Sequence, residues 1–399
     1  MSGESGLAPG APVAAGGIPL AVPHLGGNEW AYVQEALDTN WVSSVGPFVD
    51  RFEELTAARL GAGHAVAVTS GTAALHLALL LAGVEAGDEV VMPTLTFIAP
   101  ANAVGYLGAH PVFVDAEPEY WQLDVEKVAE FLERECAPEG GVLVNRRTGR
   151  RVRAVLPVHV LGHPVDLDPV VELAGRYGLV LIEDAAESIG ARYRSRALGT
   201  FGLAGCLSFN GNKVITTGGG GMLVTDDAEL AARARYLATQ AKDDPVEYVH
   251  GAVGFNYRLS NVLAAIGCAQ LEVLEEHVAA KRAVADRYRD AFDSVPGLTV
   301  MREAPWAFST HWLTTVLVDP ADVGFDSREL LRRLSNAGIQ SRPLWQPLHL
   351  SKPFADAQSY RCEVAPRIAA QSLSLPSSVG LSEAEQSRVI EAVLREVLG

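Results

Sequence analysis

Short apolar runs alternate with amphipathic helical stretches along the middle of the chain, from Ala65 to Thr225. The short runs are continuously apolar and rich in Val, Ile and Leu, which is typical of strands buried on both faces of a sheet. They cover residues 65–68, 89–92, 111–115, 154–160, 179–184, 206–209 and 222–225. Strands that alternate with helices in this way predict one α/β domain with a mostly parallel sheet of seven strands.

Helical periodicity continues on both sides of this region. Ahead of it, Asn28 is a candidate N-cap for one helix, and a second helix is expected to begin near Pro47 and to end at Gly61. Behind it, apolar positions keep helical spacing from Val262 to about Phe292, which predicts a single helix of about 30 residues. A helix of that length is expected to connect two domains.

The C-terminal part predicts a smaller α+β domain. It contains a strand over 312–318, a helix over 327–337 and a last helix over 382–398, which a Ser-x-x-Glu capping box opens at Ser382 and Glu385. The predicted parts of the chain are a flexible N-terminal arm (1–22), a large α/β domain (23–260), a long connecting helix (261–295) and a small α+β domain (296–399).

Composition excludes several classes of protein. The chain has 399 residues, of which 48% are hydrophobic, and a formal net charge of −16. It is long and apolar enough for a large core, and it lacks the clustered basic charge that binds nucleic acid or anionic membranes. The first basic residue is Arg51, so no signal or transit peptide is expected. We therefore expect a cytoplasmic protein that binds neither nucleic acid nor membrane.

The four cysteines, at positions 136, 206, 268 and 362, are far apart in the sequence. They form no CxxC or Cys/His pattern, which favours buried thiols in a reducing compartment over disulfides or a zinc site.

Lysine is scarce, with residues only at positions 127, 213, 242, 281 and 352. Four of them have charged or turn-forming neighbours and are expected to be solvated. Lys213 alone follows an apolar strand and precedes a run of four glycines, 218–221, where burial would make its amine nucleophilic. Four glycines cost conformational entropy and pack nothing, so this loop implies that backbone passes close to something.

Two other strand ends carry candidate chemistry, and ligands of open parallel sheets bind at the carboxyl ends of strands. The first strand runs into Ser70-Gly71-Thr72 at the start of an apolar helix, where free N–H groups favour an anion such as phosphate. The strand over 179–182 ends in Glu183-Asp184. A buried Asp there needs a partner such as a protonated ring nitrogen. Taken singly, the first motif is also a common structural turn, and Asp184 could equally cap the next helix.

Together, a phosphate cradle, an acid at a strand end and a lysine after a later strand describe a site for pyridoxal 5′-phosphate (PLP). An Asp paired with the pyridine nitrogen keeps the ring protonated, so that the ring withdraws electrons, and the lysine forms a Schiff base with the cofactor. This conjunction is far more specific than any of its three parts.

With these motifs the sequence resembles the fold-type-I PLP enzymes, and within them the sugar aminotransferases of the DegT/DnrJ/EryC1/StrS family. The resemblance extends from about Pro23 to the C-terminus, and four segments carry it: 70–75 (SGTAAL), 183–186 (EDAA), 208–213 (SFNGNK) and 254–259 (GFNYRL). It implies an α/β fold-type-I transferase with a large, mostly parallel seven-stranded sheet domain and a smaller α+β C-terminal domain. It also implies a homodimer whose subunits share their active sites.

The resemblance assigns roles within these segments. Lys213 would carry the cofactor as a Schiff base, and Asp184 would pair with its ring nitrogen. Gly71, Thr72 and Ser208 are expected at the phosphate, Phe97 on the ring, Glu187 near the phenolic oxygen, and Asn256 at the phosphate of the neighbouring subunit. Many family members have Gln or His where this chain has Glu187, and a carboxylate would repel a phenolate unless it is turned away or protonated.

A closer likeness, over 27–30, 40–46 and 212–221, is to aminotransferases of the legionaminic-acid type. It implies transfer of an amino group from L-glutamate, by way of pyridoxamine 5′-phosphate, to C4 of a UDP-linked 4-keto-6-deoxy-N-acetylhexosamine. The expected substrate contacts are Trp41, Ser43, Arg258, Arg342 and His349; surface arginines and packed aromatics would give the same pattern. A GDP- or dTDP-linked keto-sugar, including a longer sugar of an antibiotic pathway, remains open as the acceptor.

Three other functions would use parts of the same pattern. Related PLP proteins that act as keto-sugar dehydratases have histidine in place of the Schiff-base lysine, so Lys213 favours transamination. The complete pair of Asp184 and Lys213 disfavours a PLP-binding regulator without turnover. Metal-dependent hydrolysis would use His159 and His163, but the glycine and proline beside them break any helix that would align them, so no metal is expected.

Overall fold

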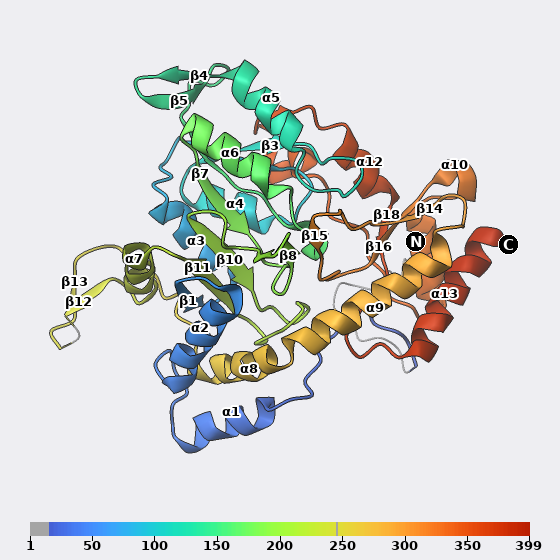
Figure 1. The fold of residues 1–399 in the computed structure, drawn as a ribbon, viewed down its shortest axis with the longest axis horizontal. Coiled ribbons are helices and arrows are strands. Elements are labelled where there is room, and N and C mark those ends of the chain that lie inside the picture. The colour runs from blue at the N-terminus through green and yellow to red at the C-terminus, as the bar shows by residue number, and fades with distance from the viewer. Residues whose placement is uncertain (1–15, 245) are drawn as a thin grey trace, which may run out of the picture.

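The structure is a computed structural model that describes residues 16–244 and 246–399. Its centre is an eight-stranded sheet in the order β1-β11-β10-β7-β6-β2-β3-β17 (Figure 1). The strands are β1 (His64–Val68), β2 (Glu89–Pro93), β3 (His110–Val114), β6 (Val152–Val155), β7 (Val180–Asp184), β10 (Ala204–Ser208), β11 (Gly221–Thr225) and β17 (Ser359–Tyr360). The first seven are the predicted ones, so the expected α/β sheet is confirmed.

Strand direction brings the ends of distant segments together. Only β11 runs antiparallel to its neighbours, β1 and β10, and the other pairings in the sheet are parallel. Gly221, the first residue of β11, pairs with both Val68 and Ser208, the last residues of β1 and β10. The carboxyl ends of β1, β7 and β10 therefore meet at one edge of the sheet, and the glycine-rich loop enters the sheet between two of them.

Helices cover both faces of the sheet (Figure 1). On one face, α3 (Gly71–Leu81), α4 (Ala99–Tyr106) and α7 (Ala228–Ala238) pack over a core that includes Val66 and Ile182. The other face is covered by α2 (Pro47–Leu60), α5 (Val125–Glu135), α6 (Leu167–Tyr177) and α8 (Asn261–Glu272). Because both faces are covered, the strands are buried nearly throughout, which explains their continuous apolar runs.

The smaller domain is built on an antiparallel sheet of β14 (Leu298–Val300), β16 (Thr315–Val318) and β18 (Ser372–Ser374). Its core lies between this sheet and the helices α9 (Leu274–Phe292), α11 (Ser327–Asn336) and α13 (Glu383–Leu398). The predicted capping box of Ser382 and Glu385 is present at the start of α13. The remaining elements are α1 (Glu29–Asp38), α10 (Pro320–Val323), α12 (Val364–Gln371), three short 3-10 turns (Val160–Gly162, Leu348–Leu350 and Lys352–Phe354), and the ribbons β4 (Cys136–Glu139) with β5 (Val142–Asn145), β8 (Arg192–Tyr193) with β9 (Arg196–Ala197) and β15 (Ala307–Phe308), and β12 (Lys242–Asp244) with β13 (Val249–His250).

The structure differs from the predicted division in two places. The eighth strand, β17, comes from the C-terminal part of the chain and pairs with β3, so residues 296–399 also complete the large sheet. The single connecting helix is broken at Val273, where φ is −107° and ψ is 8°, into α8 and α9. Because α8 packs on α1 and α2 whereas α9 packs on β14, the two halves follow the surfaces of different domains.

The predicted N-terminal arm is anchored at its described end. Residues 1–15 lie outside the described residues. Ile18 is buried in the core of the smaller domain, and its N–H donates to the Gly338 carbonyl at 2.8 Å. The anchor was missed because a few apolar residues spaced among Gly, Ala and Pro produce no helical pattern.

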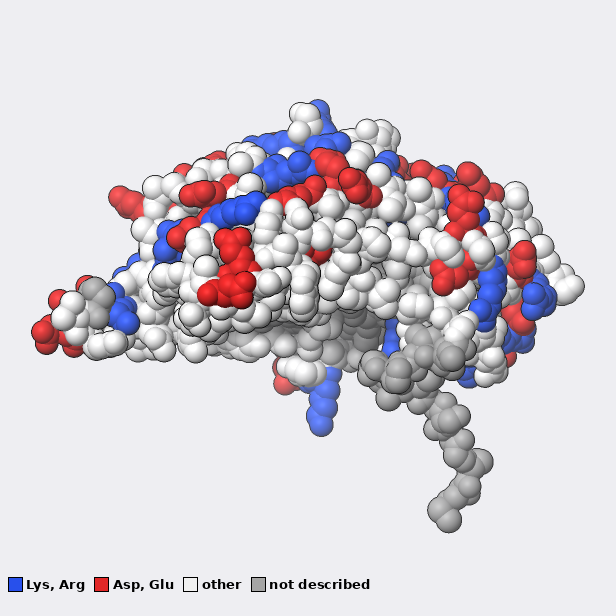
Figure 2. Space-filling model, turned by 90° about the horizontal axis from the view of Figure 1, so that it is seen from below, with Lys and Arg blue, Asp and Glu red and all other residues white. Residues whose placement is uncertain are grey.

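The surface is uneven in charge. Figure 2 views the molecule from below, the side where α1 lies in Figure 1, and most of the middle of this face is formed by residues other than Lys, Arg, Asp and Glu. The α1 region contributes exposed apolar side chains, with Trp30 at 81% and Val45 at 65% exposure. No helix in the described part of the chain is long and apolar enough to cross a membrane.

Candidate active site

A cavity of about 390 Å³ opens at the edge where β1, β7 and β10 end. Three segments that are distant in sequence line it together: the turn from β1 into α3, the residues after β7, and the loop after β10. Of the thirteen predicted site residues, seven line this cavity: Gly71, Thr72, Phe97, Asp184, Glu187, Ser208 and Lys213. The structure therefore brings together the three motifs from which a PLP site was predicted.

The end of the cavity at the start of α3, where the phosphate is expected, is built from closely packed backbone. The hydroxyl of Ser70 caps α3 by accepting from the Ala73 N–H at 3.1 Å, so the helix begins at Gly71 with its free N–H groups toward the cavity edge. A Cβ on Gly71 would lie 2.9 Å from the Ser208 Cβ, and one on Gly221 would lie 2.3 Å from the Ser70 carbonyl carbon. Glycine is therefore required at both positions, which confirms the inference that the glycine-rich loop passes close to other backbone.

Asp184 supplies a buried carboxylate at the end of β7. Its side chain accepts a hydrogen bond from the Ala186 N–H at 3.0 Å, the one recorded for it among the described residues, so one oxygen is left for a ligand. Burial raises the pKa of Asp184, while the positive charge of Lys213 opposes that rise. A protonated ring nitrogen would stabilise the charged carboxylate further, so the geometry fits the pyridine ring of PLP.

Lys213 follows β10 in a tight turn, in which its N–H donates to the Asn210 carbonyl at 3.0 Å. Its side chain is 13% exposed, and its Nζ lies 3.4 Å from the Glu187 Oε1. The same Nζ lies 4.1 Å from the centre of the Trp312 ring. The only lysine in this cavity is thus nearly buried and held between a carboxylate and an aromatic face.

Glu187 is turned toward the lysine. Its second oxygen, Oε2, accepts from the Leu161 N–H at 2.8 Å, and burial raises the pKa of its carboxyl group. As expected from the sequence, the charged form of Glu187 is therefore unfavourable unless a cation lies beside it, and the group is otherwise protonated.

Three aromatic residues form a wall of the cavity. Phe97 is 53% exposed, and its ring centre lies 6.4 Å from that of Trp345, which in turn stacks on Trp312 at 6.5 Å. Phe97 was predicted, whereas the two tryptophans were missed. Trp312 lies just before β16, and Trp345 lies just before the 3-10 turn Leu348–Leu350. No local motif marks either of them as part of a site built on the large sheet.

The predicted substrate contacts and Asn256 do not line this cavity in the single chain. His349 is connected to the segment that contains Phe97, because its Nδ1 is hydrogen-bonded to the Thr94 Oγ1 at 2.7 Å. Arg342 is half-buried next to β18, where its N–H donates to the Ser374 carbonyl at 3.2 Å. Trp41 and Ser43 are exposed and follow α1.

Arg258 is engaged inside its own chain. Its side chain is 8% exposed and forms an ion pair with Glu53, which also pairs with Arg235 at 2.7 Å. Glu53 further accepts from the Ala67 N–H at 2.7 Å, so this cluster ties α2 and α7 to β1. Asn256, two residues away, is exposed at the surface.

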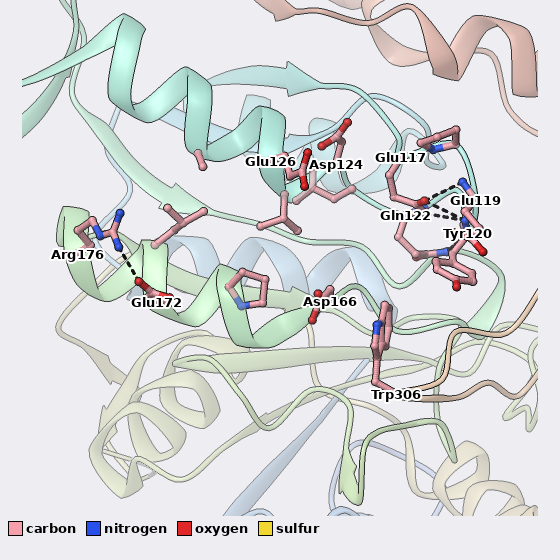
Figure 3. A pocket seen from close by; sticks show the side chains of 16 residues that line it. Glu117, Glu119, Tyr120, Gln122, Asp124, Glu126, Asp166, Glu172, Arg176 and Trp306 are labelled. Atoms are coloured by element: carbon pink, nitrogen blue, oxygen red, sulfur yellow. Dashed lines mark hydrogen bonds and ion pairs between the residues drawn. The ribbon is translucent and has the colours of Figure 1, made fainter.

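A second hollow of about 630 Å³ lies between α5 and α6 (Figure 3). Carboxylates dominate its labelled side chains, among them Glu117, Asp124 and Asp166, and its Arg176 is paired with Glu172 at 2.6 Å. It contains no lysine and none of the predicted site residues. We therefore place the chemistry in the smaller cavity.

The two histidines of the metal alternative are committed to other partners. The Nδ1 of His159 accepts from the Val165 N–H at 3.1 Å, which leaves its Nε2 to donate to Glu183 at 3.1 Å. The Nε2 of His163 accepts from the Ala304 N–H at 3.0 Å, and burial lowers the pKa of His163 to about 4. The described residues contain no group of three or more side chains suited to hold a metal ion.

The expectation that the other four lysines are solvated is wrong for two of them. Lys127 is half-buried and bonded to Asp115 at 2.6 Å. Lys281 is 3% exposed on α9, and its Nζ donates to the carbonyls of Trp312 at 3.0 Å and Ser377 at 2.8 Å. The neighbouring Arg282 led to the expectation that Lys281 lies on a solvated face of the helix. The packing of two domains against α9 buries Lys281 instead.

Burial lowers the pKa of Lys281 to about 7, and this shift predicts a pH dependence of stability. Between pH 7 and about 10 the unfolded chain binds a proton that the native chain does not, so Lys281 destabilises the fold fully below pH 7 and less as the pH rises. Between pH 7 and pH 10 this difference in proton binding raises the free energy of unfolding by roughly 4 kcal/mol. The free energy of unfolding of the wild type minus that of Lys281→Met should therefore increase from pH 7 to pH 10 in urea titrations. A difference that stays flat would show that Lys281 is charged in the native state.

Comparison with known proteins shows the family of this chain. Residues 23–394 match the model of the DegT/DnrJ/EryC1/StrS aminotransferase family. EpsN of Bacillus subtilis (strain 168), named as a pyridoxal phosphate-dependent aminotransferase, is 42% identical over 94% of this chain and 95% of its own. The GDP-perosamine synthase of Caulobacter vibrioides is 41% identical over 94% and 97%, and two further relatives bear that name. The solved structure of the aminotransferase TlmJ from Streptoalloteichus hindustanus is 33% identical, with a TM-score of 0.86 over 96% of this chain and 99% of that one.

The fold and the site together define a fold-type-I, PLP-dependent transferase. The chain belongs to the DegT/DnrJ/EryC1/StrS aminotransferase family. It is a PLP-dependent sugar aminotransferase, and the dehydratase, regulator and metal alternatives are set aside.

Proposed function

We propose that the enzyme moves an amino group from L-glutamate to the keto carbon of a nucleotide-linked sugar. The observation that carries this proposal is the cavity in which Lys213, Asp184 and the start of α3 face a common space. A lysine amine, a buried carboxylate and a helix N-terminus are the three groups that fit the aldehyde, ring nitrogen and phosphate of PLP. When bound, PLP supplies an electron sink for the carbon that bears the amino group.

Each residue of the cavity then has one task. The α3 N-terminus, with Gly71, Thr72 and Ser208, would bind the phosphate, and Phe97 would lie against the ring. Asp184 would hold the proton on the ring nitrogen. Lys213 would bind the cofactor between turnovers and, when freed by the incoming amine, its Nζ would take the proton from the carbon of glutamate that bears the amino group. The same Nζ would return a proton in the half-reaction with the keto-sugar.

The acceptor we propose is C4 of a UDP-linked 4-keto-6-deoxy-N-acetylhexosamine, as the sequence likeness implies. The names of three relatives favour a second candidate, a GDP-linked keto-sugar. We expect one nucleotide class to be turned over far faster than the others, because a site that hydrogen-bonds one base leaves polar groups unpaired with another. The test is 2-oxoglutarate release from glutamate with UDP-, GDP- and dTDP-linked 4-keto sugars in parallel. Release with none of them, under conditions in which the cofactor is bound, would contradict the proposal.

We further propose that the enzyme works as a homodimer in the cytoplasm. The exposed apolar side chains of the α1 region, including Trp30, Leu37 and Val45, support a partner surface on this face. The exposed position of Asn256 fits its expected contact with the phosphate in the neighbouring subunit. Free thiols at all four cysteines suit a reducing compartment.

A further inference from the structure

A strained turn is hydrogen-bonded to both residues that lie beside the Lys213 Nζ. In the 3-10 turn Val160–Gly162, Leu161 has a φ of 60°, which is uncommon for a residue with a branched side chain. The next residue is fixed too, because a Cβ on Gly162 would lie 2.1 Å from the Thr310 Oγ1 and its carbonyl accepts from the Thr310 N–H at 3.1 Å. Strained backbone of this kind persists only where its surroundings hold it, and it is concentrated at functional sites.

The backbone of Leu161 holds the Glu187 side chain and the Trp312 backbone at once. Its N–H donates to the Glu187 Oε2 at 2.8 Å, and its carbonyl accepts from the Trp312 N–H at 3.0 Å. Trp312 is fixed at two further points, since its indole N–H donates to the Asn212 carbonyl at 2.6 Å and its own carbonyl accepts from Lys281 at 3.0 Å. One residue in an unfavourable conformation thus sets the distance between a buried carboxylate and an aromatic face.

The Lys213 Nζ lies in the space between these two groups, 3.4 Å from Glu187 and 4.1 Å from the centre of the Trp312 ring. A carboxylate and an indole face are both groups that attract an ammonium ion, and both act more strongly where water is excluded. We propose that Glu187 and Trp312, held by Leu161, form a holding site for the Lys213 ammonium, both in the chain without cofactor and after the freed amine has taken the proton from glutamate. This inference rests on the proposed function.

The holding site explains how a carboxyl group can be accommodated at position 187. Burial opposes a lone charge on its carboxyl group, and the positive charge of Lys213 opposes that effect. The positive charge of Lys213 also opposes the rise that burial causes in the pKa of Asp184. A lysine that has taken the proton from glutamate would thus remain beside the reacting carbon, and Glu187 would lose its balancing charge when Lys213 gives that proton up. Glu187 and Trp312 are positioning residues in this account, because they act through Lys213.

Trace acetylation of the lysines measures this directly in the full chain without added cofactor. An ammonium ion does not react with acetic anhydride, so a held Lys213 should be acetylated slowly at pH 8 relative to the exposed Lys352, with the ratio read by peptide mass spectrometry. In Glu187→Gln, which keeps the shape but removes the charge, we expect Lys213 to react about five- to tenfold faster. Trp312→Leu should also accelerate it, and Trp312→Phe, which keeps an aromatic face, should do so less.

Two controls separate this effect from general loosening. Buried Lys281 should stay unlabelled in every variant, and Phe97→Leu, which alters the wall of the same cavity but keeps both Glu187 and Trp312, should leave the Lys213 ratio unchanged. If Lys281 becomes labelled in either Glu187→Gln or Trp312→Leu, that variant has loosened the fold, and the Lys213 reactivity of the other variant tests the holding site. Unchanged Lys213 reactivity in a folded Glu187→Gln or Trp312→Leu variant would overturn the holding site. Failure of the proposed function has a different signature, because wild-type chain would then form no Schiff base with added PLP.

Discussion

Replacing Lys213 by alanine should abolish transamination, with a loss of at least about a thousandfold in kcat. Two functions disappear together in this variant, the covalent attachment of the cofactor and the base that moves the proton. The cavity around the lost amine stays intact, since its walls are held by backbone contacts of Leu161, Trp312 and the α3 start. The measurement is 2-oxoglutarate release from glutamate, together with the absorbance of the Schiff base near the visible edge.

The matched control is Lys352→Ala, which removes an exposed lysine outside the cavity. It should leave both the turnover and the absorbance at the wild-type values. An unchanged absorbance spectrum in Lys213→Ala would mean that another amine binds the cofactor, and the site assignment would then be wrong.

Replacing Asp184 by asparagine should lower kcat by about a hundredfold or more while the cofactor still binds. An amide cannot supply the negative charge that keeps a proton on the ring nitrogen, so the electron sink is weakened, whereas the phosphate cradle is untouched. Cofactor binding is followed by absorbance, and turnover by 2-oxoglutarate release under saturating PLP.

The stability of the same variant provides the control. Burial penalises the charged form of Asp184, which has one recorded hydrogen bond in the described chain. The cofactor-free Asp184→Asn protein should therefore melt at or above the wild-type temperature. Full activity in this variant would contradict the ring-nitrogen role, and a large drop in melting temperature would show that Asp184 is mainly structural.

Much of the fold could be predicted because its strongest signals are local. The seven main strands are buried on both faces and give continuous apolar runs, and helix starts such as the Ser382 capping box are marked by side-chain chemistry. β17 was missed because a two-residue strand has no periodicity. The break at Val273 was missed because the helical pattern continues on either side of it while the packing surface changes.

The residues of the site were likewise predicted where the signal is local and missed where it is not. Gly71, Asp184 and Lys213 each follow a strand, and the rule that parallel strands end at one edge is enough to bring them together. Trp312 and Trp345 reach the cavity from the smaller domain, and no sequence pattern gives the relative position of two domains. The burial of Lys281 depends on the same packing of two domains, whereas the pairing of Arg258 with Glu53 depends on contacts between distant segments of the large domain.

The central claim is that the Lys213 amine binds PLP. Reduction of the wild-type protein with borohydride after incubation with PLP fixes the Schiff base, and peptide mass spectrometry then locates the pyridoxyl group. We predict that the group lies on the peptide that contains Lys213, and that prior incubation with glutamate, which frees the lysine, strongly lowers its yield. A pyridoxyl group on any of the other four lysines, or on none, would contradict the account.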